Sequence, residues 1–321
     1  MQAAQLIDGG FVRHAPHEAA DPDESSNAGA TLSALPIVHA APRPGATPPA
    51  PGRGGAGRWL ATRLPGLLLG LVSIGAVLLA WHLATTFKLD FYVRFGNIPT
   101  PADVLAKAIE VGQSGRFGMN VLISLRRILI GFALATVAGV ALGLLIGRYR
   151  LVRRLSLPAL EVLRPIPAIA WVPISVMLWP DNESSIVFIT FLGAFFPILL
   201  NTVHGVQSLD PVLLRAARSL GAREGAVLAH VVLPGALPHV FTGLAVGMGV
   251  AWVSLIAAEM ISGQFGIGYA TWEAYSLIAY PEIVLGMVVI GLLGLLCSAL
   301  INLAGRALMP WHVRSAQGGR A

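Results

Sequence analysis

Long apolar runs alternate with short polar segments along the chain from about residue 59 to residue 312. Each run holds about twenty residues or more, enough to cross a hydrocarbon core of about 30 Å at a rise of about 1.5 Å per residue. The pattern predicts an all-α fold, a polytopic membrane helical bundle of about six transmembrane helices. We expect the spans at Leu64–Phe87, Val121–Gly147, Leu157–Leu178, Ser185–Val203, Gly235–Ile261 and Ile283–Leu308.

Glycine and proline residues predict close packing of the second span and a break in the third. Gly139, Gly143 and Gly147 recur every fourth residue, which lets a second helix approach closely. The third span contains four prolines, and prolines are tolerated in a span only where neighbours satisfy the freed carbonyls. We therefore expect this span to be broken and buried in the bundle. After Pro101 a short interfacial helix is expected, with Val104 on its apolar face.

The ends of the chain differ from its centre. Residues 1–58 are rich in proline, glycine and alanine and lack apolar periodicity, which predicts a disordered cytoplasmic N-terminal tail. No apolar run near residue 1 suggests a secretory signal peptide. Residues 59–312 are expected to form the transmembrane domain, and residues 313–321 a cytoplasmic C-terminal tail.

Composition agrees with a membrane protein. The chain is 55% hydrophobic and 12% charged, against about 25% charged residues in soluble domains. Its net charge of +6 does not indicate nucleic acid, because the arginines cluster in short segments between spans. The positive-inside rule places both termini, the 148–154 loop and the segment after residue 208 in the cytoplasm. The expected location is a membrane, with lipids as neighbours.

One semi-polar segment between the fourth and fifth spans is longer than a connection requires. Asp210 is a good N-cap, Pro211 suits the first helical position, and Gly221 is a good stop, so a helix is expected over Pro211–Leu220. A second short helix, Arg223–Val232, is expected to lead to Leu233-Pro234, which redirects the chain. Two interpretations stay open: a helix–turn–helix that docks into another protein's groove, or an amphipathic helix on the lipid surface.

The segment also resembles a family signature. Ala216-Ala217, Gly221 after three residues, Val231 after nine more, and then Leu233-Pro234 resemble the cytoplasmic loop of ATP-binding-cassette importer permeases. That family motif is Glu-Ala-Ala-x3-Gly-x9-Ile-x-Leu-Pro. Arg215 stands where the family has Glu, so any salt bridge made by that Glu cannot form here.

The resemblance is closest to the branch that serves nitrate, taurine and aliphatic sulfonates, through residues 163–179, 241–261 and 266–275. It implies that residues 59–312 form the transmembrane permease domain of a homodimer in a bacterial inner membrane. This homodimer would dock on ATPase subunits and receive a small anionic solute from a periplasmic binding protein. The implied ATPase-coupling loop comprises Arg215, Ala216, Ala217, Leu220, Gly221, Leu233 and Pro234. The chain has no Gly-x4-Gly-Lys-Ser/Thr phosphate loop, so ATP is expected to be used by the partner, with no cofactor bound here.

Few ionisable residues fall inside the spans. Glu259 ends the fifth span with no basic residue within a helical turn, and unpaired carboxylates at membrane depth are often functional. Together with Trp171 and Trp252 it is a candidate for the translocation path or for gating, although packing is the alternative for both tryptophans. Water is expected to reach Glu259 near the outer end of its span.

Charged residues near the ends of spans are expected to have structural roles. Arg126 and Arg127 are both expected to snorkel at the outer interface. Glu161 and Arg164 are expected to pair at a spacing of three residues.

Other functions fit the sequence less well. A self-contained secondary transporter is the alternative, but the two halves show no convincing repeat. An intramembrane enzyme would need a convergent nucleophile and base, and a metal site would need suitably spaced ligands; neither is found, so no enzyme activity and no metal are expected.

Overall fold

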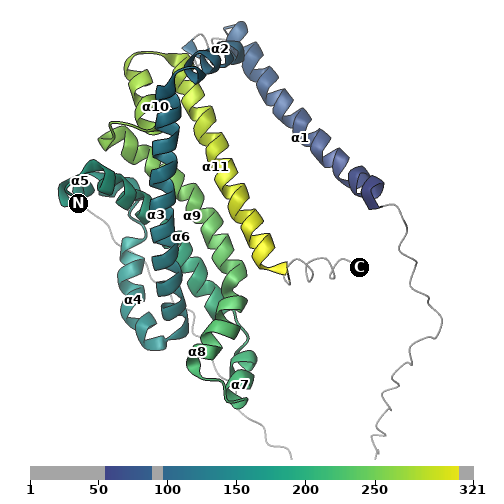
Figure 1. The fold of residues 1–321 in the computed structure, drawn as a ribbon, viewed down its shortest axis with the longest axis vertical. Helices are drawn as coiled ribbons and strands as arrows, with labels where there is room; N and C mark the ends of the chain where they lie inside the picture. The colour runs from purple at the N-terminus through teal and green to yellow at the C-terminus, as the bar shows by residue number, and fades with distance from the viewer. Residues whose placement is uncertain (1–54, 89–96, 311–321) are drawn as a thin grey trace, which may run out of the picture. The chain divides into compact units, whose positions relative to one another are not determined.

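The computed structural model describes residues 55–88 and 97–310, and every regular element in these ranges is helical (Figure 1). The all-α prediction is therefore confirmed. The predicted tails lie almost wholly outside the described residues; of residues 1–58 only Gly55–Arg58 are described, and they open the first helix. The chain divides into Met1–Thr62 and Arg63–Ala321, and the helical bundle belongs to the second unit.

From α2 onward the described helices follow one another with short connections. They are α1 (Gly55–Thr86), α2 (Pro101–Gly112), α3 (Gly115–Arg148), α4 (Arg150–Leu163), the 3-10 turn η2 (Ala168–Trp171), α5 (Val172–Leu178), α6 (Asn182–Gln207), α7 (Pro211–Ser219), α8 (Glu224–Val227), the π-helical turn η3 (Leu228–Val232), α9 (Leu233–Ser262), α10 (Ile267–Ser276) and α11 (Tyr280–Leu308).

Five helical stretches of the described chain are long and apolar enough to cross a membrane: α1, α3, α6, the run from α8 to α9, and α11. A sixth results if α4 is counted with η2–α5, two segments that are bent by 87° at a short break. The prediction of about six spans is confirmed in this sense.

The core forms where α3, α6 and α9 pack side by side (Figure 1). The glycine row of α3 faces α6 closely: a Cβ at Gly143 would lie 2.6 Å from the Cβ of Thr202. A Cβ at Gly147 would lie 2.6 Å from the Cβ of Val206. Because only glycine leaves room for this approach, the predicted helix contact is confirmed.

The proline-rich third span is broken as predicted, but its burial was predicted wrongly. α4 has no buried residue in this chain, whereas α5 buries Val172 and Ser175. Pro165 and Pro167 lie in the break, where proline cannot continue the helix. The expected Glu161–Arg164 ion pair is also absent among the described residues. α4 ends at Leu163, so Arg164 lies at the break.

The start of the fifth span differs from the prediction as well. Leu233-Pro234 does not redirect the chain, because residues 224–262 run as one helical stretch. A π-helical turn over Leu228–Val232 precedes Pro234, which occupies the first turn of α9. Pro234 has no N–H to donate to the preceding turn, and a π-helical adjustment before such a proline lets the helical stretch continue through it.

The predicted interfacial helix is present as α2. The Thr100 hydroxyl accepts from the Asp103 N–H at 3.2 Å, while Asp103 Oδ2 accepts from the Thr100 N–H at 2.9 Å. Hydrogen bonds from the Thr100 side chain and backbone lower the pKa of Asp103. Lys107 pairs with Glu110 and with Glu282 of α11, so α2 is tied to the last span.

Candidate functional site

The segment from Asp210 to Val232, hereafter the elbow, connects α6 to α9 at one end of the bundle (Figure 1). Asp210 Oδ1 accepts from the Val212 N–H at 2.8 Å and caps α7 as predicted. Leu220 is the C-cap residue, and Gly221 follows with φ +79°, a conformation that favours glycine. The predicted helix and its stop are confirmed.

The elbow has an inner and an outer apolar face. Leu214 and Ala217 pack on a small core that includes Val206, Val227 and Val232. Other apolar side chains of α7 point outward: 55% of Leu213 and 88% of Leu220 are exposed. Ala217 therefore faces the small core, away from the exposed surface of Leu213 and Leu220.

The structure places the residues of the family signature in two different environments. Arg215, Ala216 and Gly221 are exposed, and open space surrounds a Cβ placed at Gly221. Leu233 and Pro234 are half-buried at the start of α9. Thus the Leu-Pro step is partly packed at the start of α9, and the tip of the elbow consists of its exposed residues Leu213, Arg215, Ala216, Leu220 and Gly221.

Glu224 of the elbow pairs with Arg148 of α3 and with Arg218 of the elbow itself, which sequence reasoning did not foresee. Glu224 Oε2 accepts from Arg148, the last residue of α3, at 2.6 Å. Glu224 Oε1 accepts from Arg218 Nε at 2.9 Å. The carboxylate thus joins α7, α8 and α3 through exposed ion pairs.

A groove of about 390 Å³, the inner groove, lies where the break between α4 and α5 meets α6 and α9. Arg164, Asn201 and His204 supply its polar groups, and Gly193, Pro197, Val246 and Val250 are among its apolar walls. The two helices that line it, α6 and α9, are the two that the elbow connects. The inner groove therefore lies between the two core helices that the elbow joins in sequence.

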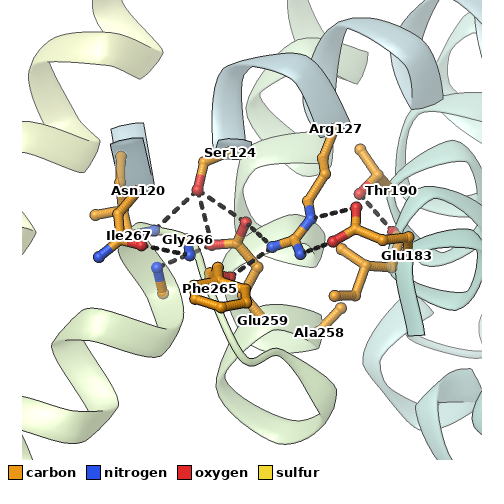
Figure 2. Close-up of polar contacts among 12 residues, drawn as sticks. Asn120, Ser124, Arg127, Glu183, Thr190, Ala258, Glu259, Phe265, Gly266 and Ile267 are labelled. Atoms are coloured by element: carbon orange, nitrogen blue, oxygen red, sulfur yellow. Dashed lines mark hydrogen bonds and ion pairs between the residues drawn. The ribbon is translucent and has the colours of Figure 1, made fainter. Parts of the chain in front are cut away.

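Towards the other end of α3, charged side chains meet in the interior (Figure 2). Arg127 Nη1 donates to Glu259 Oε1 at 2.9 Å and to the Phe265 carbonyl at 2.6 Å. Arg127 Nε donates to Glu183 Oε2 at 3.0 Å, and Nη2 donates to the other oxygen of Glu183. The exposed fraction is 2% for Arg127 and 0% for Glu259. We call Ser124, Arg127 and Glu259 the buried cluster; the Glu183 side chain, which is 51% exposed, pairs with it from α6.

The loop after α9 completes the coordination of Glu259. The Ser124 hydroxyl oxygen lies 2.8 and 2.9 Å from the two carboxylate oxygens, and the Gly268 N–H donates to Oε2 at 2.9 Å. Gly266 has φ +114°, and a Cβ there would lie 2.6 Å from Glu259 Oε2. The loop closes over the carboxylate only because this position is glycine.

The expectations for Glu259 and Arg127 were wrong. Glu259 is neither unpaired nor reached by water, and Arg127 points inward instead of snorkelling, while Arg126 is exposed. The spacing of charges within one helix cannot reveal a partner 132 residues away. The sequence could have suggested this ion pair, because an intramembrane Glu and two adjacent Arg residues were both expected near the same end of the bundle.

The two candidate tryptophans contribute to the apolar core. Trp252 is 4% exposed in the core, and Trp171 packs against the same core. Neither lines the inner groove. A role for either residue in the translocation path stays a prediction.

Comparison with known proteins agrees with this architecture. Residues 135–314 match the family described as the binding-protein-dependent transport system inner membrane component. The chain belongs to this family. Residue by residue it is 35% identical to a probable ABC transporter permease of Brucella abortus over 253 residues, covering 79% of this chain and 99% of that protein.

Permeases with named solutes are also similar. The chain is 31% identical to a nitrate import permease of Synechocystis over 255 residues, covering 77% of this chain and 90% of the relative. It is 32% identical to the taurine transport system permease of Escherichia coli over 260 residues, with 79% and 93% covered. The protein is thus an ABC transporter permease and a multi-pass membrane protein, and the relatives are transport permeases.

Proposed function

We propose that this permease forms the translocation path of an ATP-driven importer for a small anion of the nitrate, taurine or sulfonate kind. The anion is delivered by a periplasmic binding protein, and the permease works as a homodimer. The named relatives support the solute class, because they serve nitrate and taurine. The elbow and both termini are assigned to the cytoplasm, where the arginines gather.

The outward apolar tip of the elbow is the observation that carries the proposal. Leu213 and Leu220 are exposed on a helix whose other face is already packed. A rigidly held helix with a free apolar face suits docking in a groove of a partner protein. We assign this partner to the ATPase subunit, which hydrolyses the ATP for which this chain has no phosphate loop.

Transmission to the solute follows from connectivity. The elbow joins α6 to α9, and Glu224 joins it to α3, so a push on the tip reaches all three core helices. The inner groove between α6, α9 and the α4–α5 break changes width when these helices move. Arg164, Asn201 and His204 give the groove a cation and hydrogen-bond donors, which suit a small oxyanion.

The decisive experiment reconstitutes the permease with its ATPase and binding protein in liposomes. Leu220→Asp places a charge on the docking tip and is expected to abolish ATPase co-purification and ATP-driven uptake. The matched control is Leu277→Asp. Leu277 lies between α10 and α11 and is 72% exposed, against 88% for Leu220. The control is expected to leave ATPase binding intact.

Two results would contradict the proposal. Unchanged ATPase binding by Leu220→Asp would remove the elbow from the docking surface. Solute accumulation by the permease alone, driven by an ion gradient, would favour the alternative of a self-contained secondary transporter.

A further inference from the structure

A second and larger groove, the α3/α6 groove, runs along two of the membrane-length helices and encloses about 850 Å³. Its walls are mainly apolar. They include Ile130, Leu134, Val137 and Leu142 of α3, and Val187, Phe188 and Phe191 of α6. Phe188 and Phe191 stack with ring centroids 6.3 Å apart, so they form a continuous apolar strip along one wall.

Opposite charges lie together at one end of this groove. Arg126 lines it and is exposed, and it makes no ion pair or hydrogen bond within the described ranges 55–88 and 97–310. The Glu183 side chain also lines it and is 51% exposed, although its oxygens already accept from Arg127. Trp179 borders the same end and packs against Phe188, with ring centroids 5.7 Å apart.

The depth of these groups in a bilayer follows from helix geometry. Arg126 and Arg148 are 22 residues apart in the continuous helix α3, a distance of about 33 Å at 1.5 Å per residue. A hydrocarbon core is about 30 Å thick, so both arginines reach an interface while the stretch between them is within the hydrocarbon. The α3/α6 groove therefore has a charged mouth at the head-group level and an apolar body at the level of acyl chains.

We propose that the α3/α6 groove binds one phospholipid with a zwitterionic ethanolamine head group. The phosphate accepts hydrogen bonds from Arg126, the ammonium donates to Glu183, and an acyl chain lies along Phe188 and Phe191. Charge complementarity selects this lipid class. A glycerol head group brings no cation to the carboxylate, and a choline head group has no N–H to donate.

The test is native mass spectrometry of the purified, delipidated full chain, titrated with dioleoyl phosphatidylethanolamine, phosphatidylglycerol or phosphatidylcholine. The wild-type chain is expected to bind one phosphatidylethanolamine about tenfold more tightly than the other two lipids, equivalent to about 1.4 kcal/mol. Arg126→Gln is expected to remove this preference. The control Arg116→Gln changes another exposed arginine of α3, one that lies outside the groove, and is expected to preserve it.

A groove-filling variant keeps the test independent of charge. Ala133→Trp places an indole in the α3/α6 groove, about 10 Å from Arg126 along the helix, and is expected to prevent binding of the single lipid. Leu292→Trp adds the same bulk on α11, where Leu292 is 62% exposed, and is expected to bind as the wild type does.

Three outcomes overturn the proposal. The first is equal binding of the three lipids to the wild-type chain, and the second is unchanged lipid binding by both Arg126→Gln and Ala133→Trp. The third is efficient disulfide formation between two copies of Val137→Cys in native membranes, which would show that a second copy covers the groove; Val137 is 72% exposed in the single chain.

Discussion

The elbow and the buried cluster lie towards opposite ends of α3 and use charged residues in opposite ways. In the elbow, Glu224 pairs with arginines at the surface, and Arg215 and Leu220 face outward without being needed for packing. In the buried cluster, Arg127 and Glu259 are enclosed. The Glu259 carboxylate accepts hydrogen bonds from the Arg127 guanidinium, the Ser124 hydroxyl and the Gly268 N–H.

This difference separates two kinds of unusual residue in a membrane protein. A buried charge whose hydrogen bonds are all supplied by its own chain fixes the relative positions of α3, α6 and α9. An exposed apolar residue on a rigid helix has no such partner in its own chain, so it is available to another molecule. The buried end is thus expected to control stability, and the elbow end to control coupling.

The largest effect is expected for Arg127→Met. Removing the guanidinium leaves Glu259 as an uncompensated buried charge, which costs about 3–5 kcal/mol of unfolding free energy. Denaturant titration of the purified chain in detergent measures this loss. The double variant Arg127→Met/Glu259→Gln is expected to regain part of it.

The control for this variant is Arg116→Met, which breaks an exposed ion pair with Glu273 and is expected to cost at most about 1 kcal/mol. Equal stability of the Arg127 and Arg116 variants would show that the buried cluster does not hold the bundle together.

A smaller loss is expected for Gly266→Ala. The new Cβ would meet the Glu259 carboxylate, and φ +114° is strained for alanine, so about 1–3 kcal/mol is expected to be lost. Gly249→Ala is the control, because open space surrounds that position in α9 and alanine favours the helix by up to about 1 kcal/mol. If both variants shift the unfolding midpoint in the same direction, the loop does not close on Glu259 as described.

Glu224→Gln is expected to change stability by no more than about 1 kcal/mol, because its ion pairs are exposed. Its effect is expected in coupling: the elbow loses its fastening to α3, so less solute is taken up per ATP hydrolysed. Glu110→Gln, which removes the exposed pair with Lys107 on α2, serves as the control. An unchanged ratio of uptake to hydrolysis would exclude Glu224 from transmission.

The smallest structural effect is expected for Arg215→Glu. The side chain is exposed, so the unfolding free energy is expected to change by less than about 0.5 kcal/mol. If an acidic group of the ATPase faces Arg215, the reversed charge weakens ATPase binding at low salt, and Arg215→Gln has an intermediate effect. Tighter ATPase binding by Arg215→Glu would mean that the facing group is basic, as the family's usual Glu would require.

Much of this architecture was readable from local patterns. The apolar runs, the four-residue spacing of the glycines in α3, the cap at Asp210 and the stop at Gly221 depend on neighbours within a few residues. Such features are encoded by spacing, because helix periodicity and backbone conformation are local properties. The same holds for the break in the third span, which its prolines predicted.

Tertiary structure alone decided which charges meet and which faces stay open. Sequence spacing could not pair Arg127 with Glu259 or Arg148 with Glu224, because each partner lies on another helix. Nor could it tell that Arg126 and Arg127, adjacent in sequence, have opposite environments: successive residues of a helix point about 100° apart, and packing of α6 and α9 determines which direction is buried.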